Sequence, residues 1–103
     1  MQTIYFDPRY LDAVRSGRKT RTTRFRDPAR LGAAVLEFEL EQAPVRLMAN
    51  VTEVRATTFA ELTDDDAQHE ALETADQLRD VLRSHYPAIA AHDQVQVVSF
   101  QLT

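Results

Sequence analysis

The chain has 103 residues, enough for one domain but too few for two, and 44% of them are hydrophobic, an ordinary share for a globular protein. It contains no cysteine, which excludes disulfides and zinc–thiolate sites. No apolar stretch approaches the roughly 20 residues that cross a bilayer, and the N-terminus lacks a signal-peptide pattern, so we expect a cytoplasmic protein without membrane contacts.

The net charge of −4 is unevenly distributed along the chain. Residues 1–36 carry eight basic and three acidic side chains, a local balance of +5, whereas the remaining residues have a balance of −9. The basic region favours an anionic ligand, and the acidic remainder disfavours non-specific binding to nucleic acid. Pairing of the two halves across the fold explains most individual arginines equally well.

The first predicted elements are a short apolar run and a helix. The run Ile4-Tyr5-Phe6 is either a buried strand or the lead-in to that helix. Asp7 and Pro8 are typical of a helix start, because the carboxylate caps free amides and proline is tolerated in the first turn. Gly17 is a natural helix end, so the pattern predicts a helix over about residues 8–16.

The next segment, residues 19–25, is rich in threonine and is predicted to be extended. Alternation along an ideal strand puts Thr20 and Thr22 on one face and Lys19 and Arg21 on the other. Lys19 and Thr22 can then reach one ligand only if the backbone turns just before the strand. From the local pattern alone, this segment is a basic edge strand that binds anions.

The rest of the chain alternates between strand and helix signals. Three further strands are predicted at 34–40, with Leu36, Phe38 and Leu40 inward, at 45–57, with a bend or bulge after Val51, and at 95–102. Short helical segments are predicted to begin near Thr58, Thr63 and Thr74. Strands of this number with short helices between them indicate a small α+β barrel whose helices pack at its ends.

Few residues outside the basic segment suggest chemistry by themselves. The acids Asp64, Asp65 and Asp66 are interpreted as a solvated helix start, where the helix dipole favours them. Glu70 is not singled out by periodicity. The three histidines have no metal-ligand spacing, and two glycines are too few for a phosphate loop or a dinucleotide fingerprint.

The segment Gly17-Arg18-Lys19-Thr20-Arg21-Thr22-Thr23-Arg24 closely resembles the G-x-K-T-x-T-x-R signature of ASCH domains, small barrels related to the PUA fold. Further similarities lie at Leu31-Gly32, between Phe59 and Ala67, and at Val97-Val98-Ser99-Phe100. The resemblance implies that residues 1–103 form a single ASCH domain. The length is also similar to that of a stand-alone bacterial branch that acts as N(4)-acetylcytidine amidohydrolase.

That branch uses a lysine and a threonine of the signature and a later glutamate, which correspond here to Lys19, Thr22 and Glu70. The resemblance implies that Thr22 is the nucleophile, Lys19 its general base and Glu70 the acid for the leaving amine. The residues expected to bind the substrate are Arg18, Thr20, Arg21 and Arg24. For Arg24, stabilising an oxyanion and pairing with an acid are equally good interpretations. The implied partner is a small nucleoside, with no cofactor, metal or obligate protein partner.

Two other functions are compatible with the same resemblance. The domain could be a non-catalytic RNA-binding module, which the basic N-terminal region favours, or an ASCH ribonuclease in which Lys19 and nearby arginines stabilise a phosphorane. The overall negative charge and the scarcity of exposed-looking aromatic residues in the basic segment argue against a broad RNA platform.

Overall fold

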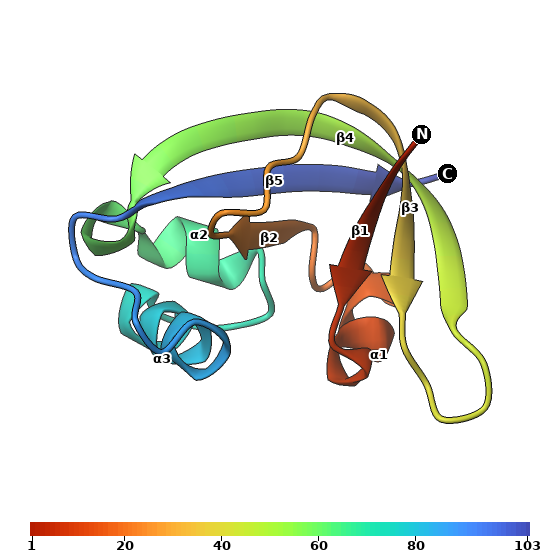
Figure 1. Cartoon of the computed structure of the whole chain (residues 1–103), viewed down its shortest axis with the longest axis horizontal. Coiled ribbons are helices and arrows are strands. Elements are labelled where there is room, and N and C mark those ends of the chain that lie inside the picture. The colour runs from red at the N-terminus through yellow and green to blue at the C-terminus, as the bar shows by residue number, and fades with distance from the viewer.

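A five-stranded mixed sheet curls into a half-barrel and forms the body of the protein (Figure 1). The computed structural model describes all residues, 1–103. The strands are β1 (Gln2–Phe6), β2 (Arg21–Arg24), β3 (Gly32–Phe38), β4 (Val45–Thr58) and β5 (Gln94–Leu102), in the spatial order β1-β3-β4-β5-β2. Only β1 and β3 run parallel, while the other neighbouring pairs are antiparallel.

The curl comes largely from β4, which has 14 residues and pairs with β3 along its first half and with β5 along its second. The register with β5 shifts between Val51 and Glu53, where the pairing with β3 ends. A bulge at this point bends the strand and increases its twist, so that one long strand serves both halves of the sheet. The predicted bulge after Val51 is confirmed.

The first helical segment consists of a 3₁₀ turn, η1 (Pro8–Tyr10), followed by the short helix α1 (Leu11–Arg15). The Asp7 carboxylate accepts a hydrogen bond from the Arg9 amide at 3.0 Å and caps the turn. Gly17 has a φ of +81°, a conformation that glycine adopts without strain, and the helix ends just before it. The predicted helix over residues 8–16 is therefore confirmed in place but begins as a 3₁₀ turn.

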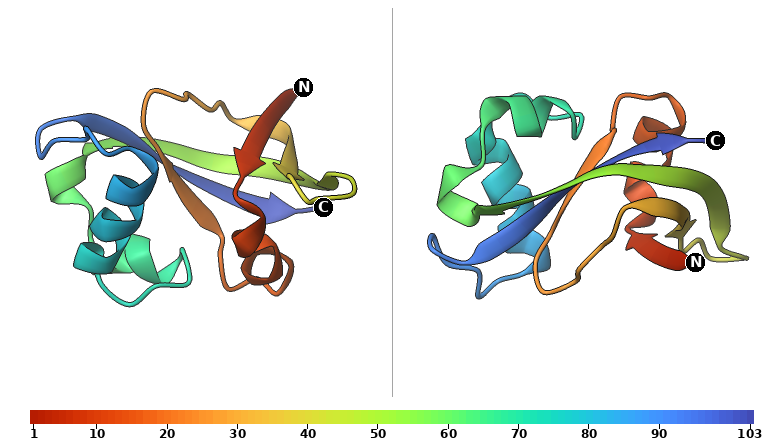
Figure 2. Two further views of the ribbon diagram at one scale, coloured as in Figure 1. Left: turned by 60° about the horizontal axis from the view of Figure 1, so that its bottom comes forward. Right: turned by 90° about the horizontal axis from the view of Figure 1, so that it is seen from above.

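The other helices lie at the opposite end of the sheet from α1 (Figure 2). They are η2 (Phe59–Glu61), α2 (Asp64–Gln68) and α3 (Ala75–His85). Thr63 and Thr74 each cap a helix in a complete capping box, with Asp66 and Gln77 as the reciprocal partners. Each cap satisfies amides that the first helical turn leaves free, which explains why these short helices begin where the threonines stand.

The hydrophobic core is divided into two clusters. The first packs α1 against β1, β3 and β4, and Phe6 stacks on Phe38 there with ring centroids 5.0 Å apart. The second packs α2 and α3 against β5 and includes Leu78, Leu82 and Val97. The two clusters meet at β5, where Val95 and Val97 belong to one and Val98 and Phe100 to the other.

The two edge strands, β1 and β2, do not pair with each other, and we call the gap between them the seam. Arg24 of β2 bridges the seam, because its Nη2 donates to the Tyr5 carbonyl of β1 at 2.6 Å. Its guanidinium also lies over the Phe6 ring, 4.9 Å from the centroid. The sheet is thus a half-barrel whose open side is held by a side chain rather than by a hydrogen-bonded ladder.

The predicted α+β class, a small barrel with short helices at its ends, is confirmed, with the sheet curled rather than fully closed. The prediction that Leu40 faces inward is wrong. The strand β3 ends at Phe38, and Leu40 lies beyond it with 39% of its surface exposed. None of the helices has the length and apolar character needed to span a membrane.

Candidate active site

The chain turns sharply between α1 and β2, and this turn decides where the signature side chains point. The Lys19 amide donates to the Ala13 carbonyl at 3.0 Å, and Lys19 forms an isolated antiparallel bridge with Glu70. The amides of Thr20 and Arg21 both donate to the His69 carbonyl. Lys19 therefore lies before β2 rather than within it. The alternation of an ideal strand does not separate it from the residues that follow.

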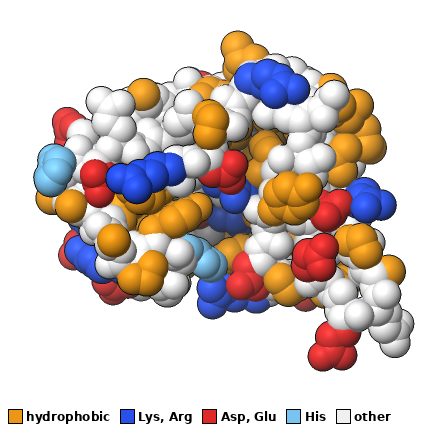
Figure 3. Space-filling model, in the orientation of Figure 1, with side chains coloured by type: hydrophobic (Ala, Val, Ile, Leu, Met, Phe, Trp, Pro, Cys, Tyr) orange, Lys and Arg blue, Asp and Glu red, His pale blue; other side chains and the backbone are white.

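A cavity of about 320 Å³ opens between the seam, η1 and α3. It is lined by Tyr5, Phe6, Asp7, Tyr10, Lys19, Thr22, Arg24, Glu70, Leu72, Val81, His85 and Tyr86. Its volume lies in the range of small-molecule sites. Figure 3 shows a hollow near the centre of one face, with hydrophobic, basic and acidic side chains around it. The three predicted catalytic residues, Lys19, Thr22 and Glu70, all line this one cavity.

Lys19 and Glu70 form a buried ion pair on the cavity wall. The Lys19 Nζ donates to Glu70 Oε1 at 2.9 Å, and the two residues expose only 4% and 7% of their surfaces. The second carboxylate oxygen, Oε2, accepts a hydrogen bond from the Thr23 hydroxyl at 2.6 Å. Lys19 Nζ also lies 5.0 Å from the centroid of the Tyr10 ring, a favourable cation–π position.

Thr22 is held differently from Thr23. It is 6% exposed, pairs with Val98 of β5 and lines the cavity. None of the side-chain hydrogen bonds uses its hydroxyl, which is also not among the fully buried polar atoms. The Thr22 hydroxyl is therefore an unengaged group at the cavity surface, whereas the Thr23 hydroxyl is committed to Glu70.

Arg24 combines fixed contacts with one free donor. Besides its bond to Tyr5 across the seam, its Nη1 lies 3.4 Å from the Asp27 carboxylate. Its Nε is buried and has no hydrogen-bond partner, the only such side-chain atom in the protein. A buried N–H without a partner is unusual, and here it belongs to a side chain that lines the cavity.

The other residues expected to bind the substrate lie outside this cavity. Arg18 is exposed, and its Nε donates to the Ser16 hydroxyl at 3.1 Å. Thr20 lines a separate, open depression beside α1, which Lys19 also borders. Arg21 points toward α2 and forms ion pairs with Asp65 and Asp66. Of the four predicted substrate-binding residues, only Arg24 lies with the catalytic three.

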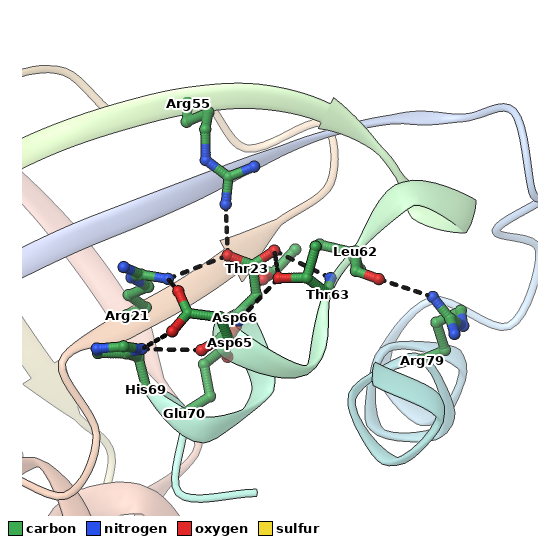
Figure 4. A network of polar contacts seen from close by, with 10 residues as sticks. All are labelled: Arg21, Thr23, Arg55, Leu62, Thr63, Asp65, Asp66, His69, Glu70 and Arg79. Atoms are coloured by element: carbon green, nitrogen blue, oxygen red, sulfur yellow. Dashed lines mark hydrogen bonds and ion pairs between the residues drawn. The ribbon is translucent and has the colours of Figure 1, made fainter. Parts of the chain in front are cut away.

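Asp66 is the centre of a polar network that anchors α2 to the sheet (Figure 4). Its carboxylate receives the Arg21 and Arg55 guanidiniums and the Thr63 amide and hydroxyl. It is 1% exposed, so the interpretation of this residue as part of a solvated helix start is wrong. Through Arg21, the network ties β2 to the helix that precedes Glu70 and fixes the relative position of the two.

Tyr10 and His85 line the opposite wall of the cavity from Thr22's strand. His85 Nε2 lies 3.0 Å from the Tyr10 hydroxyl and 3.2 Å from Arg9 Nη2. Because a guanidinium only donates, His85 Nε2 must be the acceptor, which leaves the ring proton on Nδ1. Burial raises the pKa of Tyr10 above its usual 10, so the residue remains a neutral phenol at neutral pH.

Burial, reinforced by the nearby Arg9 charge, lowers the pKa of His85 below its usual 6.5. We therefore expect the His85 ring to titrate below about pH 6.5 when its NMR resonances are followed, because charging it disrupts the contact with Arg9. The folded state binds this proton less readily than the unfolded state. Its contribution to stability is thus complete above about pH 6.5 and is lost as the pH falls toward the folded-state pKa.

The Arg9→Gln variant should move the His85 midpoint upward, since it removes a positive charge that faces the ring. The control is Arg83→Gln. Arg83 is an exposed arginine that lies on α3, as His85 does, and it forms an ion pair with Asp80. An unchanged His85 midpoint in Arg9→Gln would contradict the assigned acceptor role of Nε2.

Three residues of the site did not emerge from the sequence. Tyr10 lies within the predicted helix over residues 8–16 with nothing to mark it as a site residue, and His85 is one of the three histidines without metal-ligand spacing. No pattern links residues 75 positions apart. Thr23 had a usable signal, because alternation places it on the face opposite Thr22, and Thr23 indeed contacts Glu70 without lining the cavity.

Comparisons with known proteins identify the fold. An ASCH domain from Lactobacillus crispatus JV V101 superimposes with a TM-score of 0.76 at 12% identity, covering 98% of this chain and 78% of the other. A protein from Enterococcus faecalis V583, assigned to the family DUF984, has a TM-score of 0.71 at 20% identity, with 92% and 67% covered. No family model and no curated protein matches the sequence. The chain has the ASCH-domain fold.

Proposed function

We propose that the protein is an amidohydrolase that removes the acetyl group from N(4)-acetylcytidine or a related N-acylated cytosine nucleoside. The proposal rests on the resemblance of residues 17–24 to the ASCH signature and on one structural observation. Lys19, Thr22 and Glu70, which the resemblance implies as base, nucleophile and acid, line a single cavity of small-molecule size. The turn before β2 brings together residues that an ideal strand would separate.

The buried ion pair can both accept and donate the protons that such a reaction moves. A transfer of one proton from Lys19 Nζ to Glu70 Oε1, 2.9 Å away, converts the charged pair into an amine and a carboxylic acid. The amine is then a base and the carboxylic acid a proton donor, the forms that attack and departure require. During acylation no proton need come from solvent. The pair gains one positive charge when Lys19 accepts the Thr22 proton, the oxyanion balances that charge, and the pair returns to zero when Glu70 donates its proton.

In the acylation step, the neutral Lys19 amine accepts the proton of the Thr22 hydroxyl as the oxygen attacks the acetyl carbonyl. The carbonyl oxygen becomes an oxyanion, for which the Arg24 guanidinium at the cavity is the candidate donor. The C–N bond then breaks as Glu70 protonates the exocyclic nitrogen. The products are cytidine and an acetyl ester on Thr22, and the pair returns to its charged form.

In the deacylation step, a water molecule enters the space that cytidine has left. The Glu70 carboxylate accepts a proton from the water molecule, and the water oxygen attacks the ester carbonyl. The C–O bond to Thr22 breaks as Lys19 returns a proton to the Thr22 oxygen. Acetic acid leaves and loses its proton to solvent, and the pair is again the amine and carboxylic acid with which acylation began. The wall formed by Tyr5, Tyr10 and Tyr86 offers aromatic surface to a nucleobase during both steps.

The test is to incubate the purified protein with N(4)-acetylcytidine and, separately, with labelled single-stranded RNA, and to follow both by chromatography. We expect release of cytidine and acetate and intact RNA. Cleavage of RNA without deacetylation would support the ribonuclease instead. Salt-sensitive RNA binding with neither reaction would support the binding module.

The charge distribution favours the small substrate over RNA. Of the eight basic side chains among residues 1–36, those of Arg9, Lys19, Arg21 and Arg24 form ion pairs with carboxylates. Only Lys19 and Arg21 pair with acids from outside residues 1–36, so the basic excess of this region is reduced but not removed. The four paired side chains are less available for a row of phosphates.

A further inference from the structure

We propose that Thr23 is a positioning residue that sets the protonation equilibrium of the Lys19–Glu70 pair, an inference that rests on the proposed function. The Thr23 hydroxyl donates to Glu70 Oε2 at 2.6 Å, while Lys19 Nζ donates to Oε1 at 2.9 Å. Each carboxylate oxygen thus has one protein donor. All three residues expose 7% of their surface or less, so water competes little for these contacts.

Thr23 acts through Glu70 and not on the substrate. Neighbouring residues of a strand point to opposite faces, and Thr22 faces the cavity while Thr23 does not line it. Arg21, two residues before Thr23, shares its face and contacts α2. Thr23 therefore reaches the carboxylate from outside the cavity and holds the oxygen that Lys19 leaves free.

A hydroxyl suits this position because it can serve both forms of Glu70. It donates to the carboxylate, and by turning its hydrogen away it accepts from the carboxylic acid. Its bond to the charged form is the stronger of the two, since charge-assisted hydrogen bonds exceed neutral ones. Thr23 thus favours the ion pair at rest without leaving the acid form unsatisfied, whereas a valine could do neither.

Apart from Lys19, no ionisable group makes a hydrogen bond with the Glu70 carboxylate. The charged or titratable side chains that line the same cavity are Asp7, Tyr10, Lys19, Arg24 and His85. Beyond the cavity, Arg21 and Asp66 lie on the α2 side and bond to each other. Removing the Thr23 hydroxyl therefore changes one contact of Glu70 and leaves its charged neighbours in place.

The expected effect is asymmetric in pH. On the acid side, a proton adds to the Glu70 carboxylate while Lys19 stays charged, and losing Thr23 makes that protonation easier. On the alkaline side, Lys19 loses its proton and Glu70 remains a carboxylate. The hydrogen bond from Thr23 therefore stabilises the protonated and deprotonated states of Lys19 equally. In Thr23→Val, we expect the acid limb of the kcat/KM profile to move to higher pH by about one unit, with the alkaline limb unchanged.

The experiment measures kcat/KM for N(4)-acetylcytidine from acid to alkaline pH in the wild type, Thr23→Val and Thr23→Ser. Thr23→Ser keeps the hydroxyl and should keep the wild-type profile. The matched control is Thr57→Val, a half-buried threonine of β4 outside the cavity, which should shift neither limb. Should Thr23→Val fail to fold, Thr23→Ala removes the hydroxyl without adding a methyl group and carries the same test.

A second readout separates this inference from the proposed function. The Glu70 side-chain carboxyl resonance, followed by ¹³C NMR, should titrate about one pH unit higher in Thr23→Val than in the wild type. That shift would support Thr23 even if the wild type proved inactive on acetylcytidine, which would overturn the function alone. An unmoved acid limb together with an unmoved Glu70 resonance would overturn the role of Thr23.

Discussion

The Thr22→Val variant is expected to lose deacetylation of N(4)-acetylcytidine by about 10³-fold or more, because removal of a nucleophile leaves only binding and the remaining polar groups to accelerate the reaction. Valine matches threonine in shape and suits a strand. The Thr22 hydroxyl makes no hydrogen bond with the protein, so the fold should not depend on it. The free energy of unfolding should equal or exceed that of the wild type, since the change removes a polar group from a largely buried position.

The measurement is cytidine release by chromatography together with urea unfolding of the same samples. Thr22→Ser, which keeps a hydroxyl, should retain activity, and rapid quenching of wild-type turnover should reveal protein heavier by one acetyl group. Thr57→Val serves as the control for replacing a threonine within a strand. Wild-type turnover in Thr22→Val would show that water, not Thr22, attacks the amide, and Lys19 and Glu70 would then have to activate that water.

A second large effect is expected on stability from the Lys19–Glu70 pair. Glu70→Leu leaves the Lys19 ammonium buried without its carboxylate, which costs about 3–5 kcal/mol in comparable cases. For a domain whose total stability is of the order of 5–15 kcal/mol, this is a large share. The double variant Lys19→Met with Glu70→Leu removes both charges and should be clearly more stable than Glu70→Leu alone.

Urea unfolding of the two single variants and the double variant measures this coupling. The control is Asp80→Asn, which breaks an exposed pair with Arg83 on α3 and should change stability by less than about 1 kcal/mol. Strictly additive effects of the Lys19 and Glu70 changes would contradict the ion pair as a coupled unit. A Glu70→Leu variant too unstable to purify would agree with the expected cost, provided that the double variant folds.

The fold was largely predictable because its signals are local. Alternating apolar residues define β3, β4 and β5, Thr63 and Thr74 are at the helix caps, and the bulge after Val51 appears where the alternation changes phase. Leu40 shows the limit of this reasoning. Alternation continued past Phe38 although the strand did not, because where a strand ends depends on its pairing partner and not on its own pattern.

The site was less predictable because its contacts join distant segments. Glu70 came from the family resemblance alone, and only the structure relates it to Lys19 through a bridge across 51 residues. The basic and acidic parts of the chain proved to meet at particular pairs, with Asp66 buried between Arg21 and Arg55. A charge count indicates that such pairing is possible, but it does not tell a buried partner from a solvated one.

The seam between β1 and β2 has a consequence for where a ligand can enter. In a fully closed small barrel, side chains fill the interior and backbone hydrogen bonds complete the wall, so no opening remains along the side. Here the backbone hydrogen bonds between β1 and β2 are absent. Arg24 and the cavity lie where those bonds would be. The Arg24 side chain covers part of the unpaired edge of β2, and an edge covered in this way is a poor template for pairing with another chain. The open side of the half-barrel is the route by which a ligand would reach the cavity. The hydrogen bond from Arg24 to the Tyr5 carbonyl fixes the distance between the two strands that border it.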